Sequence, residues 1–253
     1  MPTLNTAFKQ IFGEALEPLG FQKIKGKHPY FVRVVPGGEI IHVITYANSW
    51  CGEHGKKAIN IFGGVATVYR RIIDLSTSPS SNFSWLTSNF EIYGYLPECN
   101  REFRNSIFDF KYKENDETSM FNALEYSLKI TREIMLPYIN KANDLNACIA
   151  FLEKFNLPIS TNSFKLNSNF DGCDYHDEGF LYIKTDYKEL KEKWKKILNG
   201  ETDTTDEMRE KIAVKYKFFD DPIIQKKALE EIERRKVDNT ERLSSYGFDV
   251  KKR

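Results

Sequence analysis

The sequence predicts an α+β fold, in which an N-terminal helix packs on an antiparallel β-sheet and further helices follow. An amphipathic helical pattern opens the chain, three apolar runs with strand-like alternation come next, and the last part shows helical periodicity with densely charged faces. The 253 residues have room for one large domain or two small ones. We place an α+β domain at residues 1–158 and a mainly helical C-terminal segment at 159–253. That segment either stands alone or packs on the first domain as one unit.

The first predicted helix spans residues 3–18. Its apolar residues recur at steps of three and four, which places them on one stripe of the helix. Thr3 has a side chain suited to the N-cap. Gly20 can adopt the left-handed conformation that ends a helix without steric cost. The helix therefore ends just before the sheet begins.

Three strands are predicted after this helix, at residues 28–35, 39–47 and 57–69. Proline fixes one backbone dihedral and glycine allows positive φ, so the Pro36–Gly38 segment forms the turn between the first two strands. Both faces of the second strand are largely apolar. We therefore expect it to be a central strand covered on both sides, with the first helix on one of them.

The remaining elements follow from the same periodicities. They are a strand at 105–112, helices at 119–140 and 144–155, and, beyond an irregular polar region at 159–179, helices at 187–198, 206–218 and from Pro222 onward. Thr118 or Ser119 is the expected cap of the long helix, and Pro137 is expected to kink or end it. We expect the aromatic-rich stretch 83–98 to be irregular and the chain from Ser244 onward to fray.

The charge balance gives no global attraction to nucleic acid or to a membrane surface, because 37 Lys and Arg residues face 36 Asp and Glu residues. No apolar run approaches the roughly 20 residues that a membrane helix needs, and the N-terminus shows no signal-peptide pattern. The four cysteines are too scattered for a secreted disulfide framework. We expect a reduced, cytoplasmic protein without membrane contact.

Two Cys-x-x-His units form the one constellation that suggests a metal. Cys51 and His54 lie in the loop after the second strand, and Cys173 and His176 lie in the irregular polar region. Two thiolates and two imidazoles can complete a tetrahedral zinc shell. The units are far apart in sequence, however, and such spacings also arise by chance. Two unrelated loops are the simpler interpretation, so we expect no cofactor and keep zinc as the alternative.

An enzymatic interpretation would place a small pocket near the Gly63–Gly64 pair. Paired glycines inside a strand indicate a bulge, or the close approach of another backbone or a ligand. Cys51 and His54 could form a nucleophile–base pair, but no third residue that would orient the base is identifiable. His42 lies in an apolar strand, where a core histidine is the default. The candidate binding residues are His42, Tyr46, Trp50, Cys51, His54, Gly63 and Gly64.

A basic cluster runs from Lys23 to Arg33 and is interleaved with aromatic residues. Such a surface can follow phosphates and stack bases. Lysines on an edge strand also deter edge-to-edge pairing, which explains the cluster equally well. Because the whole chain is close to neutral, we do not expect nucleic acid as the partner.

The N-terminal part resembles a widespread bacterial family catalogued only as a domain of unknown function. The resemblance rests on the opening helix with Leu19-Gly20-Phe21, the strand Tyr30-Phe31-Val32-Arg33, the strand Ile59-Asn60-Ile61-Phe62-Gly63, and the later Leu136-Pro137-Tyr138-Ile139. It covers roughly residues 1–155. The third of these motifs departs from the family's spacing, and Thr45-Tyr46 stands where the family usually has a glutamine. The resemblance implies an α+β fold and no assigned chemistry.

Taken together, these patterns favour a non-enzymatic protein of the protein-binding, adaptor or antidote type, with another protein as partner. The absence of any catalytic motif and the many aromatic residues around the sheet support this, since aromatic residues often anchor protein contacts. The alternatives are a small-pocket enzyme or metal-binding protein that uses Cys51 and His54 with His42 or with Cys173 and His176, and a nucleic-acid binder that uses the Lys23–Arg33 strand.

Overall fold

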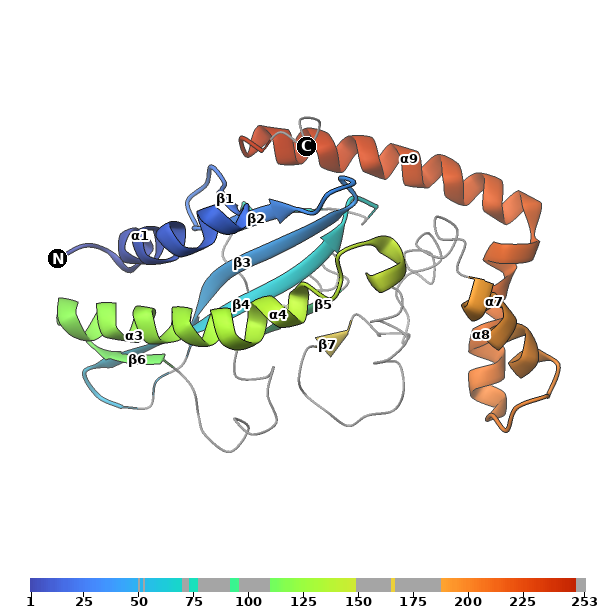
Figure 1. Cartoon of the computed structure of the whole chain (residues 1–253), viewed down its shortest axis with the longest axis horizontal. Coiled ribbons are helices and arrows are strands. Elements are labelled where there is room, and N and C mark those ends of the chain that lie inside the picture. The colour runs from blue at the N-terminus through green and yellow to red at the C-terminus, as the bar shows by residue number, and fades with distance from the viewer. Residues whose placement is uncertain are drawn as a thin grey trace.

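A computed structural model of the chain describes residues 1–49, 51, 53–69, 73–76, 92–95, 110–148, 165–166 and 188–248 (Figure 1). The helices are α1 (Leu4–Leu16), a 3₁₀ turn (Glu17–Leu19), α3 (Glu117–Ile130), a π-helical turn (Thr131–Met135), α4 (Leu136–Ile139), α7 (Lys188–Leu198), α8 (Asp206–Asp220) and α9 (Pro222–Ser245). The strands are β1 (Gln22–Lys23), β2 (Phe31–Val34), β3 (Ile40–Ser49), β4 (Lys56–Thr67), β5 (Ile92–Tyr95), β6 (Phe110–Lys113) and β7 (Lys165–Leu166). The predicted α+β class is confirmed.

The strands form one antiparallel sheet in the order β1-β2-β3-β4-β5-β7, with β6 paired to the start of β4. β3 lies between β2 and β4 and is buried from Ile40 to Ala47, which confirms the predicted central strand. β5 lies within the stretch 83–98 that was expected to be irregular, so that expectation is wrong for Ile92–Tyr95. Of the strand expected at 105–112, residues 105–109 lie outside the described residues.

The predicted N-cap of α1 and the stop at Gly20 are confirmed, although the α-helix itself ends at Leu16 and a 3₁₀ turn covers the last predicted residues. The Thr3 side chain accepts a hydrogen bond from the Thr6 amide, as an N-cap does. Gly20, with φ of +84°, ends the 3₁₀ turn that follows the helix. These signals are local in the chain, and for that reason they are readable from the sequence.

The Gly63–Gly64 pair forms no bulge, so the expectation of a bulge is wrong. β3 and β4 pair without interruption from Ile40–Thr67 to Ser49–Ala58, and Gly63 lies opposite Ile44 in that register. A Cβ atom on Gly63 would lie 2.7 Å from the sulfur of Met135. A side chain at position 63 would therefore force Met135, which approaches the strand from the π-helical turn, to shift.

The long helix departs from its predicted form at both ends. Its N-cap is Asp116, whose carboxylate accepts from the Ser119 amide at 2.9 Å. The Ser119 hydroxyl instead accepts from the Lys113 amide, which ties β6 to α3. Pro137 neither ends nor breaks the helix, because a π-helical turn precedes it and α4 continues to Ile139. The wider turn accommodates a residue that lacks an N–H group.

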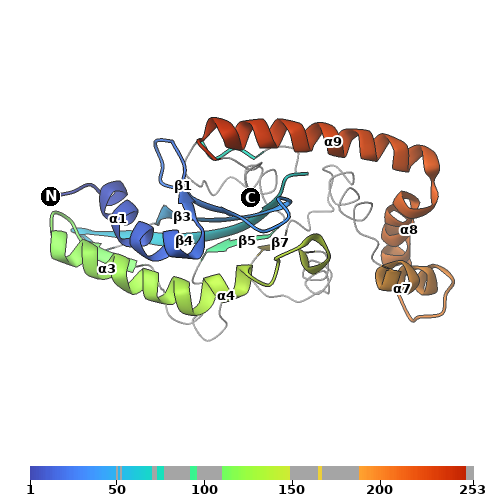
Figure 2. The ribbon, with the colours of Figure 1, turned by 45° about the horizontal axis from the view of Figure 1, so that its top comes forward.

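α1 covers one face of the sheet, and α3 with α4 lies beside it. Phe8 of α1 packs against Phe31 and Tyr46, with ring centroids 5.9 and 5.0 Å apart. Met135 reaches the same face over Gly63. Figure 2 shows α9 on the opposite side of the sheet from α3 and α4. The sheet is therefore enclosed between helices, as its two apolar faces require.

The C-terminal half of α9 is tied to the segment that follows β4. The Asn239 side chain accepts from the Ile73 amide and donates to the Val68 carbonyl, each at 2.9 Å. The Tyr246 carbonyl accepts from the Lys25 amide at 2.8 Å. Phe248 is almost fully buried, so the expected fraying from Ser244 onward is wrong as far as residue 248. The expected domain boundary at residues 158–159 lies outside the described residues.

Candidate functional site

A polar groove lies where the first turn of α1 meets the ends of β3 and β4. This is the end of the molecule at which the N-terminus and β6 also lie (Figure 1). The groove has a volume of about 530 Å³. Its lining residues are Thr3, Leu4, Asn5, Tyr46, Asn48, Cys51, Lys56, Lys57, Ala58 and Tyr112. Tyr46 and Cys51 are the two candidate binding residues that the structure brings to one place.

Tyr46 and Asn5 form the fixed part of the groove. The Tyr46 hydroxyl donates to Asn5 Oδ1, and Asn5 Nδ2 donates to the Lys27 carbonyl at 3.2 Å. Burial raises the pKa of Tyr46 to about 12, and the nearby Tyr112 hydroxyl acts in the same direction. Tyr46 is therefore protonated at neutral pH. The carboxamide of Asn5 has both of its ends engaged, so its orientation in the groove is set.

Lysine side chains bring positive charge to this end of the sheet, and carboxylates pair with most of it. Glu53 pairs with Lys56 at 2.5 Å and with Lys111 at 2.6 Å, and these two ammonium groups lower the pKa of Glu53 to about 2. Lys57 lies 3.6 Å from Glu114. Lys56 and Lys57, the two lysines that line the groove, thus each have a carboxylate beside them.

The start of α1 adds to this positive character. The first amides of a helix carry a partial positive charge, and acidic residues in the first turn usually offset it. The first turn of α1 has no acidic residue. Thr3 satisfies only the Thr6 amide. The N-terminal end of the helix dipole therefore faces the groove without a compensating carboxylate from its own first turn.

Cys51 and His54 do not form a nucleophile–base pair. The Cys51 thiol is half-buried and lies 3.9 Å from the Glu53 carbonyl, to which it donates. His54 is exposed. In the described part of the chain, no hydrogen bond joins the two side chains. Within the described residues, His54 is therefore not placed to activate this thiol.

His42 and the glycine pair lie far from the loop of Cys51 and His54. Ser49, where the loop begins, lies seven positions after His42 along β3. At about 3.3 Å per residue, that is roughly 23 Å. Gly63 and Gly64 lie opposite Ile44 and Val43, at the His42 end. A single pocket made from these candidates does not form.

His42 is a buried, fully bonded histidine. Its Nε2 lies 2.8 Å from the Ala142 carbonyl, which can only accept, so Nε2 carries the proton. Its Nδ1 then accepts from Arg33 Nη2 at 2.7 Å. Burial lowers the pKa of His42 to about 4, although the bond to Ala142 acts in the opposite direction. His42 is neutral at physiological pH and joins the sheet to the segment after α4.

The remaining candidate residues belong to parts of the chain that the structure does not describe. Trp50, Cys173 and His176 lie outside the described residues. Among the residues that are described, no three or more His, Cys, Asp and Glu side chains gather in a way that could hold a metal ion. The expectation that the two Cys-x-x-His units are unrelated loops, and the alternative that they share zinc, therefore stay predictions.

The basic Lys23–Arg33 cluster is divided by the fold. Lys23 lies on β1, the first strand in the sheet order, and it is exposed, as are Lys25 and Lys27. Arg33 instead points inward to His42. The cluster is thus not one continuous basic surface.

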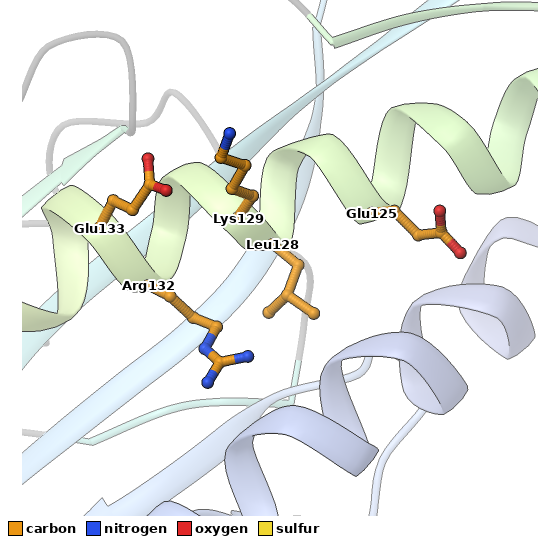
Figure 3. A pocket seen from close by; sticks show the side chains of 5 residues that line it. All are labelled: Glu125, Leu128, Lys129, Arg132 and Glu133. Atoms are coloured by element: carbon orange, nitrogen blue, oxygen red, sulfur yellow. The ribbon is translucent and has the colours of Figure 1, made fainter.

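A further hollow, of about 320 Å³, lies along α3 and its π-helical turn. Figure 3 shows Lys129 and Glu133 projecting on one side of the helix, and Leu128 and Arg132 on the other. These side chains do not converge on a common point, so we assign no function to this surface.

Sequence reasoning missed Asn5, Lys56, Lys57 and Tyr112 as members of the groove. Lys56 and Lys57 stood beside the Cys51–His54 loop, and adjacent lysines at a strand start were an available signal. Asn5 gave no signal, because its contact with Tyr46 joins positions 41 residues apart.

Comparison of the chain with protein-family models, with curated proteins and with solved structures finds no match. Within the described residues, no helix is long and apolar enough to cross a membrane.

Proposed function

We propose that the chain is a non-catalytic binding protein that holds an acidic segment of a partner protein in the polar groove at the start of α1. The observation that carries this proposal is the combination of a helix N-terminus without acidic residues and the lysines Lys56 and Lys57 around one groove. Both features favour a negatively charged ligand.

The shape and lining of the groove favour a protein segment over a small molecule. Small-molecule sites are mostly enclosed and apolar. This groove is lined mainly by Tyr, Asn, Thr and Lys side chains, which can bond to an extended chain and its carboxylates. Tyr46 adds a large, rigid contact surface with a polar end, a combination that is frequent at protein interfaces.

The states of the nucleophile and base candidates support a binding role. His42 has both ring nitrogens engaged and is neutral. Cys51 donates to a backbone carbonyl, with no base bonded to it in the described part of the chain. His42 therefore has no ring nitrogen free to exchange a proton with a substrate, and Cys51 has no bonded base among the described residues to activate it.

Fluorescence anisotropy with labelled decapeptides tests the proposal. We expect a Glu-rich peptide to bind, and the same peptide with Gln in place of Glu to bind at least tenfold more weakly. Added salt should weaken the binding of the Glu-rich peptide. The variant K56E/K57E should lose at least tenfold in affinity. The matched control K226E/K227E reverses two exposed charges on α9 and should bind as the wild type does. Equal binding of both peptides, or undiminished binding by K56E/K57E, would refute an acidic partner segment.

A further inference from the structure

A second hollow, separate from the groove, lies beside Arg33 at the His42 end of the sheet. Its volume is about 390 Å³. The 3₁₀ turn contributes Leu19, and the end of β2 contributes Val35 and Pro36. Asn140 and Asn143 line it from the segment after α4. We call this hollow the Arg33 pocket.

Arg33 is a half-buried cation whose bonding partners are all neutral. Its Nη1 donates to the Leu19 carbonyl at 3.3 Å, and its Nη2 donates to His42 Nδ1 and to Asn140 Oδ1. The guanidinium also lies over the Phe21 ring, 4.6 Å from the centroid. No carboxylate of the described residues pairs with it. Burial lowers the pKa of Arg33, and no negative charge of the described residues counteracts that effect.

The guanidinium is also held in one orientation. A guanidinium has five N–H groups, and the three bonds above use three of them. The Nε–H group and one Nη1–H group make no hydrogen bond among the described residues. His42 acts as a positioning residue, because its bond to Ala142 directs the Nδ1 lone pair at Arg33. A charged, preoriented donor that faces a pocket is a suitable receptor for an anion.

We infer that the Arg33 pocket binds an organic monocarboxylate with a short apolar body. Arg33 would hold the carboxylate, with help from the amide groups of Asn140 and Asn143. Leu19, Val35 and Pro36 would contact the body of the ligand. A phosphate group fits less well, because the lining has a single cation and a large apolar part.

Two sources share this chemistry, namely a free branched acid and the C-terminal carboxylate of a peptide. The probes are 4-methylpentanoate for the first source and N-acetyl-leucine for the second, added to the full chain. Two-dimensional NMR of the arginine Nε–H signals reports on Arg33 directly. We expect a saturable shift of that signal with a dissociation constant in the millimolar range, about what so few ligand atoms provide. The probe that binds with the higher affinity identifies the source of the natural ligand.

The variant N143D places a carboxylate at the exposed edge of the pocket, where it should leave the fold intact. We expect it to weaken binding of 4-methylpentanoate at least tenfold. The control N146D adds the same charge at an exposed position outside the lining and should bind as the wild type does.

Several outcomes would overturn the assignment. The uncharged 4-methylpentanamide could bind as tightly as 4-methylpentanoate, or inorganic phosphate could bind more tightly than it. N143D could bind 4-methylpentanoate as tightly as the wild type does. The Arg33 signal could also fail to shift at 10 mM of either carboxylate, a concentration on the order of ten dissociation constants.

Discussion

His42 should make the protein less stable as the pH falls from 7 toward 5. The side chain is 1% exposed, and its pKa of about 4 lies below the ordinary value of 6.5 that the unfolded chain regains. Between these two values the unfolded chain binds a proton that the folded chain does not. The free energy of unfolding therefore decreases with acidification below pH 6.5, and this loss is complete below about pH 4.

The expected magnitude follows from the two pKa values. Their difference, at about 1.36 kcal/mol per pH unit, corresponds to roughly 3 kcal/mol once both forms are protonated. At pH 5 the unfolded chain is almost fully protonated at this site and the folded chain is not, so about 2 kcal/mol is already lost. That is a large share of the stability of an ordinary domain.

Urea unfolding followed by circular dichroism at pH 7.5, 6 and 5 measures this effect. The variant H42Q has no titrating group at this position. It should be less stable at pH 7.5, by about 1–3 kcal/mol from imperfect hydrogen bonds. Its further loss between pH 7.5 and 5 should be smaller than that of the wild type by about 2 kcal/mol. The control H54Q changes a histidine in the exposed loop and should keep the wild-type profile.

The pKa of His28 is also lowered, chiefly by burial, so His28 adds a loss of the same sign to all three proteins. The comparison between H42Q and the wild type removes this common contribution. An H42Q profile parallel to that of the wild type would refute the reasoning. So would a long-range ¹H–¹⁵N spectrum in which His42 titrates near pH 6.5 or carries its proton on Nδ1.

Two further predictions concern contacts that join distant parts of the chain. G63A should lower the free energy of unfolding by about 1–3 kcal/mol, because its Cβ would lie 2.7 Å from the Met135 sulfur. In a double-mutant cycle measured by urea unfolding, M135A should relieve part of that cost. Strictly additive effects of the two substitutions would contradict the contact. N239A should leave the Ile73 amide and the Val68 carbonyl without partners and lower the free energy of unfolding by about 2–5 kcal/mol. Hydrogen exchange at the Ile73 amide should then be faster than in the control K236A. Unchanged protection of that amide would show that Asn239 does not bond to it.

Turns and helix ends were the features best predicted from the sequence. Thr3, Gly20 and the Pro36–Gly38 turn act within a few residues of themselves, and the structure has each where expected. The start of α9 at Pro222, with Asp221 accepting from the Ile223 amide, is of the same kind. The cap of α3 was one exception, because Asp116, Thr118 and Ser119 all have capping side chains and only the position of β6 selects among them.

The candidate site was much less predictable. Tyr46 and Cys51 were named as candidates and do share a groove, but His42, Gly63 and Gly64 do not line it. A strand pattern shows which face a residue occupies. It does not show which helix will contact that face, and the lining of a groove depends on that helix.

The sequence by itself determined the α+β class, the amphipathic helices, the central apolar strand and most turns, because each depends on periodicity or on the conformational preference of nearby residues. Only the tertiary structure decided what the polar and small residues are for. The bonds of Tyr46 to Asn5, of Arg33 to Asn140 and of Ile73 to Asn239 join positions 41, 107 and 166 residues apart. Such pairs form where packed elements meet, and no local pattern in the chain records where that will be.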